Sequence, residues 1–306
     1  MPTIKHCLSM RDFSAEQITL VLDTAEQMKK LILGGTKRLP HLQGKSIVTL
    51  FYENSTRTRM SFELASKYMS AVAANISASA SSVAKGETLL DTGRTLERMG
   101  TDVLIVRHPM AGAPMLLAQH CECGIINAGD GMNEHPTQAL LDLFTMRERF
   151  GGFDGLTVAI VGDVLHSRVA RSNLWALLTL GANVRLAGPP TLIPMGIGDM
   201  GAQVTTDVEE ALTGADVVMG LRVQKERQQR GLFPDVREYA ALYGINAKRL
   251  SAARDDVLVM HPGPMNRGAE ISSDVADGAF SKIEEQVTNG VAVRMALLYL
   301  MTKEGE

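Results

Sequence analysis

The sequence predicts an α/β fold made of two doubly wound parallel-sheet domains joined by a long helix, and three observations support this prediction. The chain has 306 residues, which is more than one hydrophobic core usually spans. Short apolar runs alternate with amphipathic stretches along most of the chain, as expected when helices connect parallel strands. A glycine-rich break at residues 151–155 separates two such series.

Apolar, β-prone runs predict four strands before the break and five after it. These runs lie at residues 46–52, 73–77, 102–106, 124–128, 157–161, 184–187, 203–205, 216–219 and 257–260. A helical stretch at about 136–150 is expected to bridge the two halves. The resulting prediction is a division into a first domain of residues 1–150 and a second of residues 151–283.

The last predicted helix, at about 284–301, has apolar residues at mixed spacings of three and four. They are Val287, Val291, Met295, Leu298 and Met301. Such a broad apolar stripe must pack against another element. We predict that a C-terminal helix of about 284–306 returns to the first domain.

The composition excludes several classes of protein. A net charge of −3 argues against a nucleic-acid surface, which usually carries a strong basic excess. Cys7, Cys121 and Cys123 have neither the number nor the spacing of a disulfide framework or a zinc site, so reduced thiols in a cytoplasmic protein are expected. No apolar run approaches bilayer length, and no membrane association is expected.

Hydroxyls and guanidiniums are concentrated where the first predicted strand gives way to a helix. The residues are Ser55, Thr56, Arg57, Thr58 and Arg59. The first N–H groups of a helix lack internal partners and lie at its positive end, so a phosphate or carboxylate binds well there. An ordinary capped helix with solvated arginines is the alternative, but one cap explains only one hydroxyl.

Polar residues follow other predicted strands as well, and all fall on the same edge of the predicted sheets. They include Arg107, His135, Gln138, Asp163, Arg168, Arg222 and Gln224, and the last predicted strand ends in His261-Pro262-Gly263-Pro264. Each residue alone also has a purely structural interpretation. Arg107 could form a surface ion pair, His135 could close a turn, and Arg168 could pair with Asp163 or Glu53. Together they predict a cleft lined with cations.

The sequence contains incomplete matches to two nucleotide-binding motifs, and neither supports nucleotide binding. Gly44-Lys45-Ser46 resembles the end of a P-loop, but Leu39 occupies the position of the required glycine, and the segment precedes a strand. Gly162-Asp163-Val164 follows a strand without the further glycines of a dinucleotide fingerprint. No metal-ligand spacing and no nucleophile elbow is present in the sequence, so neither a cofactor nor a metal is expected.

The combination of these motifs, in order and over nearly the whole chain, resembles the aspartate carbamoyltransferase family. The motifs are residues 55–59, Arg107-His108-Pro109, His135-Pro136-Thr137-Gln138, Gly162-Asp163 with Arg168, and residues 222–227. The resemblance implies transfer of a carbamoyl group from carbamoyl phosphate to L-aspartate, the committed step of pyrimidine synthesis, without cofactor or metal. It also implies a homotrimer with shared active sites, and leaves open a regulatory chain or a dihydroorotase partner.

The resemblance further implies roles for individual residues. Ser55, Thr56, Arg57 and Thr58 would bind the phosphate. Arg107, His135 and Thr58 would bind the carbamoyl oxygen, and Gln138 the amino group. Arg168 would hold the α-carboxylate of aspartate, Arg222 with Gln224 its side-chain carboxylate, and the carbonyls of Gly263 and Pro264 the amine. Ser81 or Ser82 and Lys85 would come from the adjacent subunit, and Glu53 would pair with Arg168.

Alternative functions remain to be distinguished. An ornithine carbamoyltransferase carries a His-Cys-Leu-Pro motif where this chain has His261-Pro262-Gly263-Pro264, and Arg222 suits a carboxylate better than an ammonium. Some related chains have leucine at the position of Gly263. A nicotinamide dehydrogenase would need the missing glycine fingerprint. A catalytically silent anion-binding homologue would not need every phosphate-binding residue.

Overall fold

The structure is a computed structural model, and it describes residues 3–77, 86–223 and 235–303. Two compact units make up the chain. The first contains residues 1–144 and 288–306, and the second contains residues 145–287, so the division falls inside the long helix α5 (Pro136–Phe150). This helix has the bounds that the sequence predicts.

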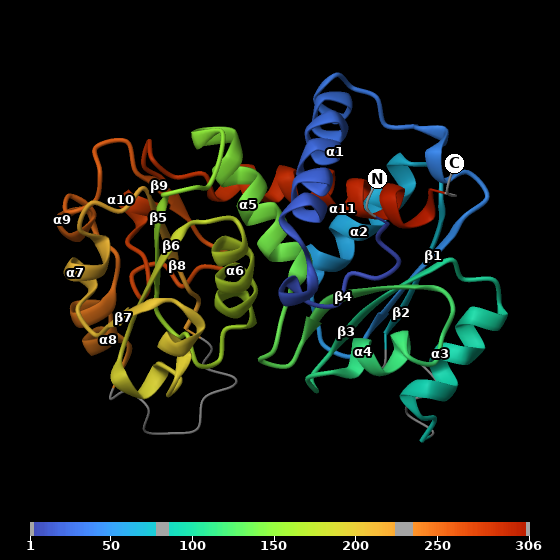
Figure 1. The fold of residues 1–306 in the computed structure, drawn as a ribbon, viewed down its shortest axis with the longest axis horizontal. Helices are drawn as coiled ribbons and strands as arrows, with labels where there is room; N and C mark the ends of the chain where they lie inside the picture. The colour runs from blue at the N-terminus through green and yellow to red at the C-terminus, as the bar shows by residue number, and fades with distance from the viewer. Residues whose placement is uncertain (1–2, 78–85, 224–234, 304–306) are drawn as a thin grey trace. The chain divides into compact units, whose positions relative to one another are not determined.

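The first unit is built on a four-stranded parallel sheet within the described residues, with strand order β2-β1-β3-β4 (Figure 1). Its strands are β1 (Ser46–Phe51), β2 (Val72–Ser77), β3 (Val103–His108) and β4 (Gly124–Asp130). Helices α3 (Leu89–Arg98) and α4 (Ala113–Ala118) cover one face, and α1 (Ala15–Leu33) and α2 (Thr56–Tyr68) lie on the other (Figure 1). Strands β1, β3 and β4 are mostly buried, whereas the edge strand β2 is largely exposed.

The C-terminal helix α11 (Ile283–Thr302) returns to the first unit, as the sequence predicts. The Tyr299 ring lies 5.2 Å from the ring of His41, and the Arg294 guanidinium lies 4.9 Å from the centre of the Phe62 ring. These contacts join the helix to the N-terminal half of the chain. Within its predicted apolar stripe, Met295 and Leu298 are fully buried, whereas Val287 is exposed.

The second unit is built on a five-stranded parallel sheet within the described residues, with strand order β7-β6-β5-β8-β9. Its strands are β5 (Thr157–Val161), β6 (Asn183–Ala187), β7 (Gln203–Thr205), β8 (Val217–Gly220) and β9 (Leu258–Met260). Every predicted strand is present, with bounds shifted by no more than two residues. The central strands are mostly buried, as their apolar runs predict, whereas the edge strands β2 and β7 are largely exposed.

Helices cover both faces of this second sheet. Side chains of α7 (Val208–Leu212) and α10 (Ser273–Ala276) share a buried cluster with β5, β8 and β9, and Leu250 of α9 (Ala247–Leu250) packs against it. Helix α6 (Arg168–Thr179) lies on the opposite face (Figure 1). Helix α8 (Val236–Tyr243) buries Tyr239 against Leu192 and Val223.

The three cysteines are buried thiols without a disulfide. Burial raises the pKa of the Cys123 thiol to about 12, so the neutral, unreactive form prevails at neutral pH. None of the helices in the described residues combines the length and apolar character needed to cross a bilayer.

Candidate active site

The strand order of the first unit places a topological switch point between β1 and β3. From β1 the chain moves to β2 on one side, and it later returns to β3 on the other side of β1. Ligands of open α/β sheets bind beyond the carboxyl ends of the strands at such a point. The Ser55–Arg59 cluster follows β1, and Arg107 lies at the end of β3, so both belong to this switch point.

Helix α2 begins at Thr56, so Thr56, Arg57 and Thr58 form its first turn and Ser55 is the N-cap. The Ser55 side chain makes no capping hydrogen bond, whereas Ser14 accepts one from the Gln17 amide at 3.2 Å at the start of α1. Helix capping therefore does not explain the Ser55 hydroxyl. This outcome favours the anion-binding interpretation of the cluster.

The two arginines of the cluster have different environments. Arg59 places its guanidinium 5.4 Å from the centre of the Phe51 ring, a packing contact with the strand below it. Arg57 is exposed, and Thr58 beside it is buried. Arg57 is therefore the arginine of this pair that is accessible to a ligand at the helix N-terminus.

Arg107 lies within β3, because this strand runs two residues beyond its predicted end and pairs Arg107 with Phe51 of β1. Its Nη1 donates to the Ala128 carbonyl at 3.3 Å, and its Nε lies 3.2 Å from Oε2 of Glu53. Only 13% of the Arg107 side chain is exposed. The cation is thus held across the switch point by contacts to neighbouring segments.

A bulge at the end of β4 leads the chain towards His135. Val106 pairs with Asn127 but His108 with Asp130, so β4 has one extra residue. The Asn127 side chain donates to Oδ1 of Asp130 at 2.9 Å, and Asp130 accepts the Glu134 amide at 3.0 Å. Bulges are common next to active sites, where they redirect a side chain.

The loop after this bulge is fixed by close packing. Gly131 has φ = 53°, and a Cβ there would lie 2.8 Å from the Pro109 carbonyl oxygen. His135 precedes the first residue of α5, is 4% exposed, and accepts the Gln138 amide at 2.9 Å through its carbonyl. The sequence interpretation missed Asn127 and Asp130, although a polar residue inside an apolar strand was a usable signal.

The second unit has its own switch point, between β5 and β8, by the same reasoning from its strand order. Arg168 is the first residue of α6 after β5, is 4% exposed, and follows Ser167, which caps the helix by accepting the Ala170 amide at 3.1 Å. Arg222 follows β8 by two residues and is partly exposed. Two predicted aspartate-binding arginines therefore lie at the ends of adjacent strands.

Buried acid–histidine pairs accompany these arginines. Nδ1 of His166 lies 2.8 Å from Oδ1 of Asp163 after β5. After β9, Nε2 of His261 lies 3.3 Å from Oε1 of Glu270. The sequence interpretation did not identify Glu270, because it follows Gly263 by seven residues in a loop with no periodic pattern.

The segment after β9 is held through His261. Nδ1 of this histidine accepts the Gly263 amide at 2.9 Å, and the Gly263–Pro264 peptide bond is cis. Glu270 also accepts the Asn266 amide at 2.6 Å. These contacts fix the backbone that carries the carbonyls of Gly263 and Pro264.

Some predicted site residues lie outside the described residues. They are Ser81, Ser82, Lys85, Gln224 and the charged run 225–227. Among the residues that the structure describes, no three or more His, Cys, Asp or Glu side chains are arranged to bind a metal ion.

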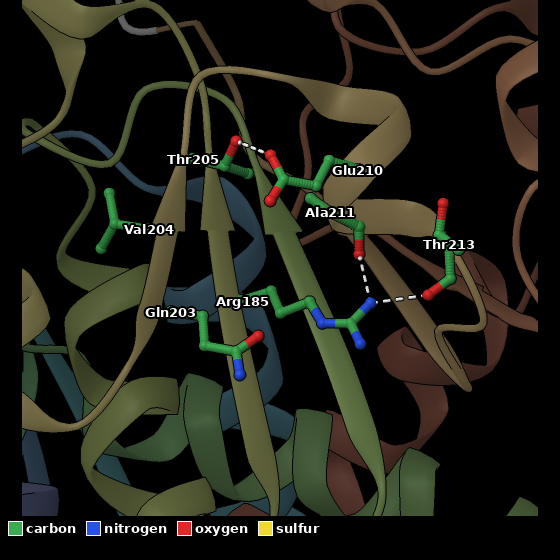
Figure 2. A pocket seen from close by; sticks show the side chains of 7 residues that line it. All are labelled: Arg185, Gln203, Val204, Thr205, Glu210, Ala211 and Thr213. Atoms are coloured by element: carbon green, nitrogen blue, oxygen red, sulfur yellow. Dashed lines mark hydrogen bonds between the residues drawn. The ribbon is translucent and has the colours of Figure 1, made fainter.

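A pocket of about 290 Å³ lies at the edge of the second sheet that is formed by β7, and it is lined by residues of β6, β7 and α7 and by Thr213 (Figure 2). Figure 2 shows Arg185 turned towards the end of α7, where its Nη1 donates to the carbonyls of Ala211 at 3.3 Å and Thr213 at 2.6 Å. No predicted site residue lines this pocket. Arg185 is therefore a structural arginine that contrasts with Arg168 and Arg222.

Comparison with known proteins identifies the family of this chain. Residues 5–148 match the carbamoyl-P binding domain of aspartate/ornithine carbamoyltransferases, and residues 154–301 match their Asp/Orn binding domain. The chain is 63% identical over 301 residues to the aspartate carbamoyltransferase catalytic subunit of Ruminiclostridium cellulolyticum, covering 98% of this chain and 96% of that protein.

Solved structures of both branches of the family resemble this fold. An aspartate transcarbamoylase from Trypanosoma cruzi, in complex with carbamoyl aspartate and phosphate, matches with a TM-score of 0.87 and 32% identity over 98% of each chain. Another structure of that enzyme holds N-(phosphonacetyl)-L-aspartic acid. Ornithine carbamoyltransferase from Pyrococcus furiosus matches with the same TM-score at 29% identity over 98% of each chain. The chain therefore belongs to the aspartate/ornithine carbamoyltransferase family.

Proposed function

We propose that this protein transfers the carbamoyl group of carbamoyl phosphate to the amine of L-aspartate, giving N-carbamoyl-L-aspartate and phosphate. The observation that carries the proposal is that each unit presents arginines at its topological switch point. Arg57 and Arg107 do so in the first unit, and Arg168 and Arg222 in the second. Relatives at about 60% identity that are named aspartate carbamoyltransferase support aspartate as the acceptor.

Carbamoyl phosphate binds at the first switch point in this proposal. Its phosphate accepts hydrogen bonds from the hydroxyls of Ser55, Thr56 and Thr58 and from the N–H groups at the start of α2. The guanidinium of Arg57 can donate two parallel hydrogen bonds to the same phosphate. Arg107, His135 and Thr58 bind the carbonyl oxygen. Gln138 in the first turn of α5 binds the amino group.

Aspartate binds at the second switch point. Arg168 holds the α-carboxylate, and Arg222 with Gln224 holds the side-chain carboxylate, because a planar guanidinium matches a carboxylate. The carbonyls of Gly263 and Pro264 accept hydrogen bonds from the attacking amine. Lys85, with Ser81 or Ser82, is contributed by a neighbouring copy of the chain, so the proposal includes a homotrimer with shared active sites, located in the cytoplasm.

The reaction proceeds by direct attack without a covalent intermediate, because carbamoyl phosphate already carries a good leaving group. The amine of aspartate attacks the carbonyl carbon, negative charge develops on the carbonyl oxygen, and the C–O bond to phosphate then breaks. Donors held at that oxygen by Arg107 and His135 stabilise the charge. The departing phosphate takes the amine proton, while His135 acts as a neutral hydrogen-bond donor.

Ornithine is the alternative acceptor, and the fold does not distinguish the two, since both branches match with a TM-score of 0.87. Arg222, two residues after β8, favours aspartate in this proposal. Arg222 would repel the side-chain ammonium of ornithine and attract the carboxylate of aspartate.

The purified chain with carbamoyl phosphate and either aspartate or ornithine, scored for phosphate release and for the carbamoylated product, tests the proposal. We expect turnover with aspartate and none with ornithine. Turnover with ornithine alone would assign the chain to the other branch. Binding of carbamoyl phosphate without turnover of either amine would make the protein a silent homologue.

A further inference from the structure

The first unit contains two buried side chains of opposite charge, Asp142 and Arg294, that have no direct role in the proposed reaction. Asp142 of α5 is fully buried, and Arg294 of α11 is 3% exposed. Burying two charges costs several kcal/mol each, and their attraction offsets that cost only with good geometry and additional hydrogen bonds. The contacts of the pair therefore indicate what it does.

Arg294 is enclosed by the helices that carry the first switch point. Its guanidinium lies over Phe62 of α2, one turn after Thr58, and its Nη1 donates to the Gly290 carbonyl at 3.0 Å. Its Nη2 lies 3.5 Å from the Thr137 hydroxyl in the first turn of α5. A Cβ at Gly290 would lie 2.6 Å from Nη1, so the glycine leaves room for the cation.

The charges of the pair support one another. Burial lowers the pKa of Arg294 to about 10, and the nearby Asp142 carboxylate acts in the opposite direction. An ionised carboxylate can accept hydrogen bonds but cannot donate them.

Asp142 contacts Gln138, which lies one turn earlier on α5. Oδ1 of Asp142 accepts a hydrogen bond from Nε2 of Gln138 at 2.9 Å. Because the carboxylate only accepts, the NH₂ group of the carboxamide must face Asp142, and the oxygen Oε1 must face away from it. Oε1 makes no hydrogen bond to the residues that the structure describes. It is an acceptor available for a ligand.

We propose that Asp142 and Arg294 are positioning residues that fix the Gln138 carboxamide with Oε1 available to the amino group of carbamoyl phosphate, which makes the site selective for a carbamoyl over an acetyl group. The inference rests on the proposed function. Acetyl phosphate has a methyl group in place of the NH₂ group and cannot donate to Oε1. A site built to accept a hydrogen bond discriminates strongly against an analogue that lacks the donor.

Binding of carbamoyl phosphate and of acetyl phosphate, each measured by calorimetry on the full chain, tests the proposal. In the isosteric Asp142→Asn variant, the new amide side chain can both donate and accept hydrogen bonds, so the Gln138 carboxamide can rotate by 180° and exchange its NH₂ and oxygen positions. We expect the affinity for carbamoyl phosphate to fall about tenfold while that for acetyl phosphate stays the same, so their ratio falls about tenfold.

Gly290→Ala provides a second, independent variant, because the added methyl group displaces Arg294 without touching Gln138. We expect the affinity ratio to fall here as well. Arg294→Lys keeps the positive charge and should retain more of the ratio than Arg294→Met. Asp102→Asn is the matched control: Asp102 accepts the Ser46 amide at 2.7 Å at the opposite end of β1, so its loss should alter stability and leave the ratio unchanged.

The outcomes separate this proposal from the proposed function. A wild-type chain that binds neither phosphate compound would contradict the proposed function and this inference with it. A wild-type chain that binds both compounds equally would overturn this inference alone, because the proposed function requires only that carbamoyl phosphate binds. A wild-type chain that discriminates, with Asp142→Asn and Gly290→Ala lowering both affinities in parallel, would show that the pair is only structural and would overturn this inference alone.

Discussion

The two switch points use arginine in different settings. In the first unit, Arg57 is exposed at a helix N-terminus rich in hydroxyls, and Arg107 contacts the Glu53 carboxylate and the Ala128 carbonyl. In the second unit, the strand ends that carry Arg168 and Arg222 also carry two buried acid–histidine pairs.

This difference matches the charges of the two ligands. A phosphate dianion needs many donors, and a helix N-terminus with adjacent hydroxyls supplies them without further cations. Two carboxylates need two separated guanidiniums, and the neighbouring buried acids then fix loop backbone, as Glu270 does for Asn266. The same sheet topology therefore supports two kinds of anion site through the residues at its strand ends.

The largest expected effect is at the first switch point. Arg107→Ala should lower kcat by about two to three orders of magnitude, because it removes a fixed donor to the oxygen that becomes negatively charged. Arg57→Ala should have a comparable effect. Steady-state kinetics measures this change, and circular dichroism checks the fold. Arg38→Ala, an exposed arginine that precedes β1, is the control and should behave as wild type. Near-normal turnover of Arg107→Ala would remove this residue from the site.

The next largest effect is at the second switch point. Arg222→Ala should raise the KM for aspartate about tenfold to a hundredfold, because hydrogen bonds to a charged group are worth about 1.5–3 kcal/mol. Its affinity for carbamoyl phosphate should not change, which separates the two switch points. Arg185→Ala, which removes the structural arginine of Figure 2, should lower stability and leave the KM for aspartate unaltered. An unchanged KM in Arg222→Ala would contradict the assignment of the second switch point.

A smaller effect distinguishes two helix N-caps. Ser14→Ala should lower the free energy of unfolding by about 1 kcal/mol without affecting kinetics, because Ser14 caps α1. Ser55→Ala should leave stability unchanged and weaken carbamoyl phosphate binding about fivefold, the loss of one hydrogen bond. Urea unfolding and calorimetry compare the two variants. A stability loss in Ser55→Ala, with binding intact, would favour simple capping.

The smallest effect concerns pH and the first unit. Burial lowers the pKa of His108, whose Nδ1 accepts the Met110 amide at 3.0 Å. The unfolded chain therefore binds this proton at a higher pH than the folded chain does. The stabilising contribution is complete above about pH 6.5 and is lost as the pH falls through the lowered value. Urea unfolding between about pH 7.5 and 5 should show a shallower loss of stability in His108→Gln than in wild type. Identical slopes would show that His108 does not contribute.

Most of the fold could be predicted, because apolar runs mark buried strands regardless of what packs on them. The run that predicts β5 has the bounds of the strand itself, and so does the helical stretch that predicts α5. The largest shifts are at the ends of β3 and β4, which each run two residues beyond their predicted ends. In β3 these residues are Arg107 and His108, which are polar and yet belong to the strand. Their backbone pairing with β1 and β4 outweighs the polarity of their side chains.

The accessible residues of the candidate site were also identifiable, since ligand-binding groups gather at strand ends. The residues that hold them in place were not. Asp142 and Arg294 are 152 positions apart by residue number, and only the packing of α11 on the first unit brings them into one cluster. The β4 bulge likewise depends on a register that hydrophobic pattern does not reveal.

The most direct test of the account is the affinity of the chain for N-(phosphonacetyl)-L-aspartic acid, which combines a phosphonate with the two carboxylates of aspartate. Calorimetry should show tight binding to the wild-type chain and to Arg38→Ala and Arg185→Ala, and binding weakened at least about tenfold by either Arg107→Ala or Arg222→Ala. Unchanged affinity in either of these last two variants would contradict the claim that the first switch point binds the phosphonate part of the ligand and the second binds its aspartate part.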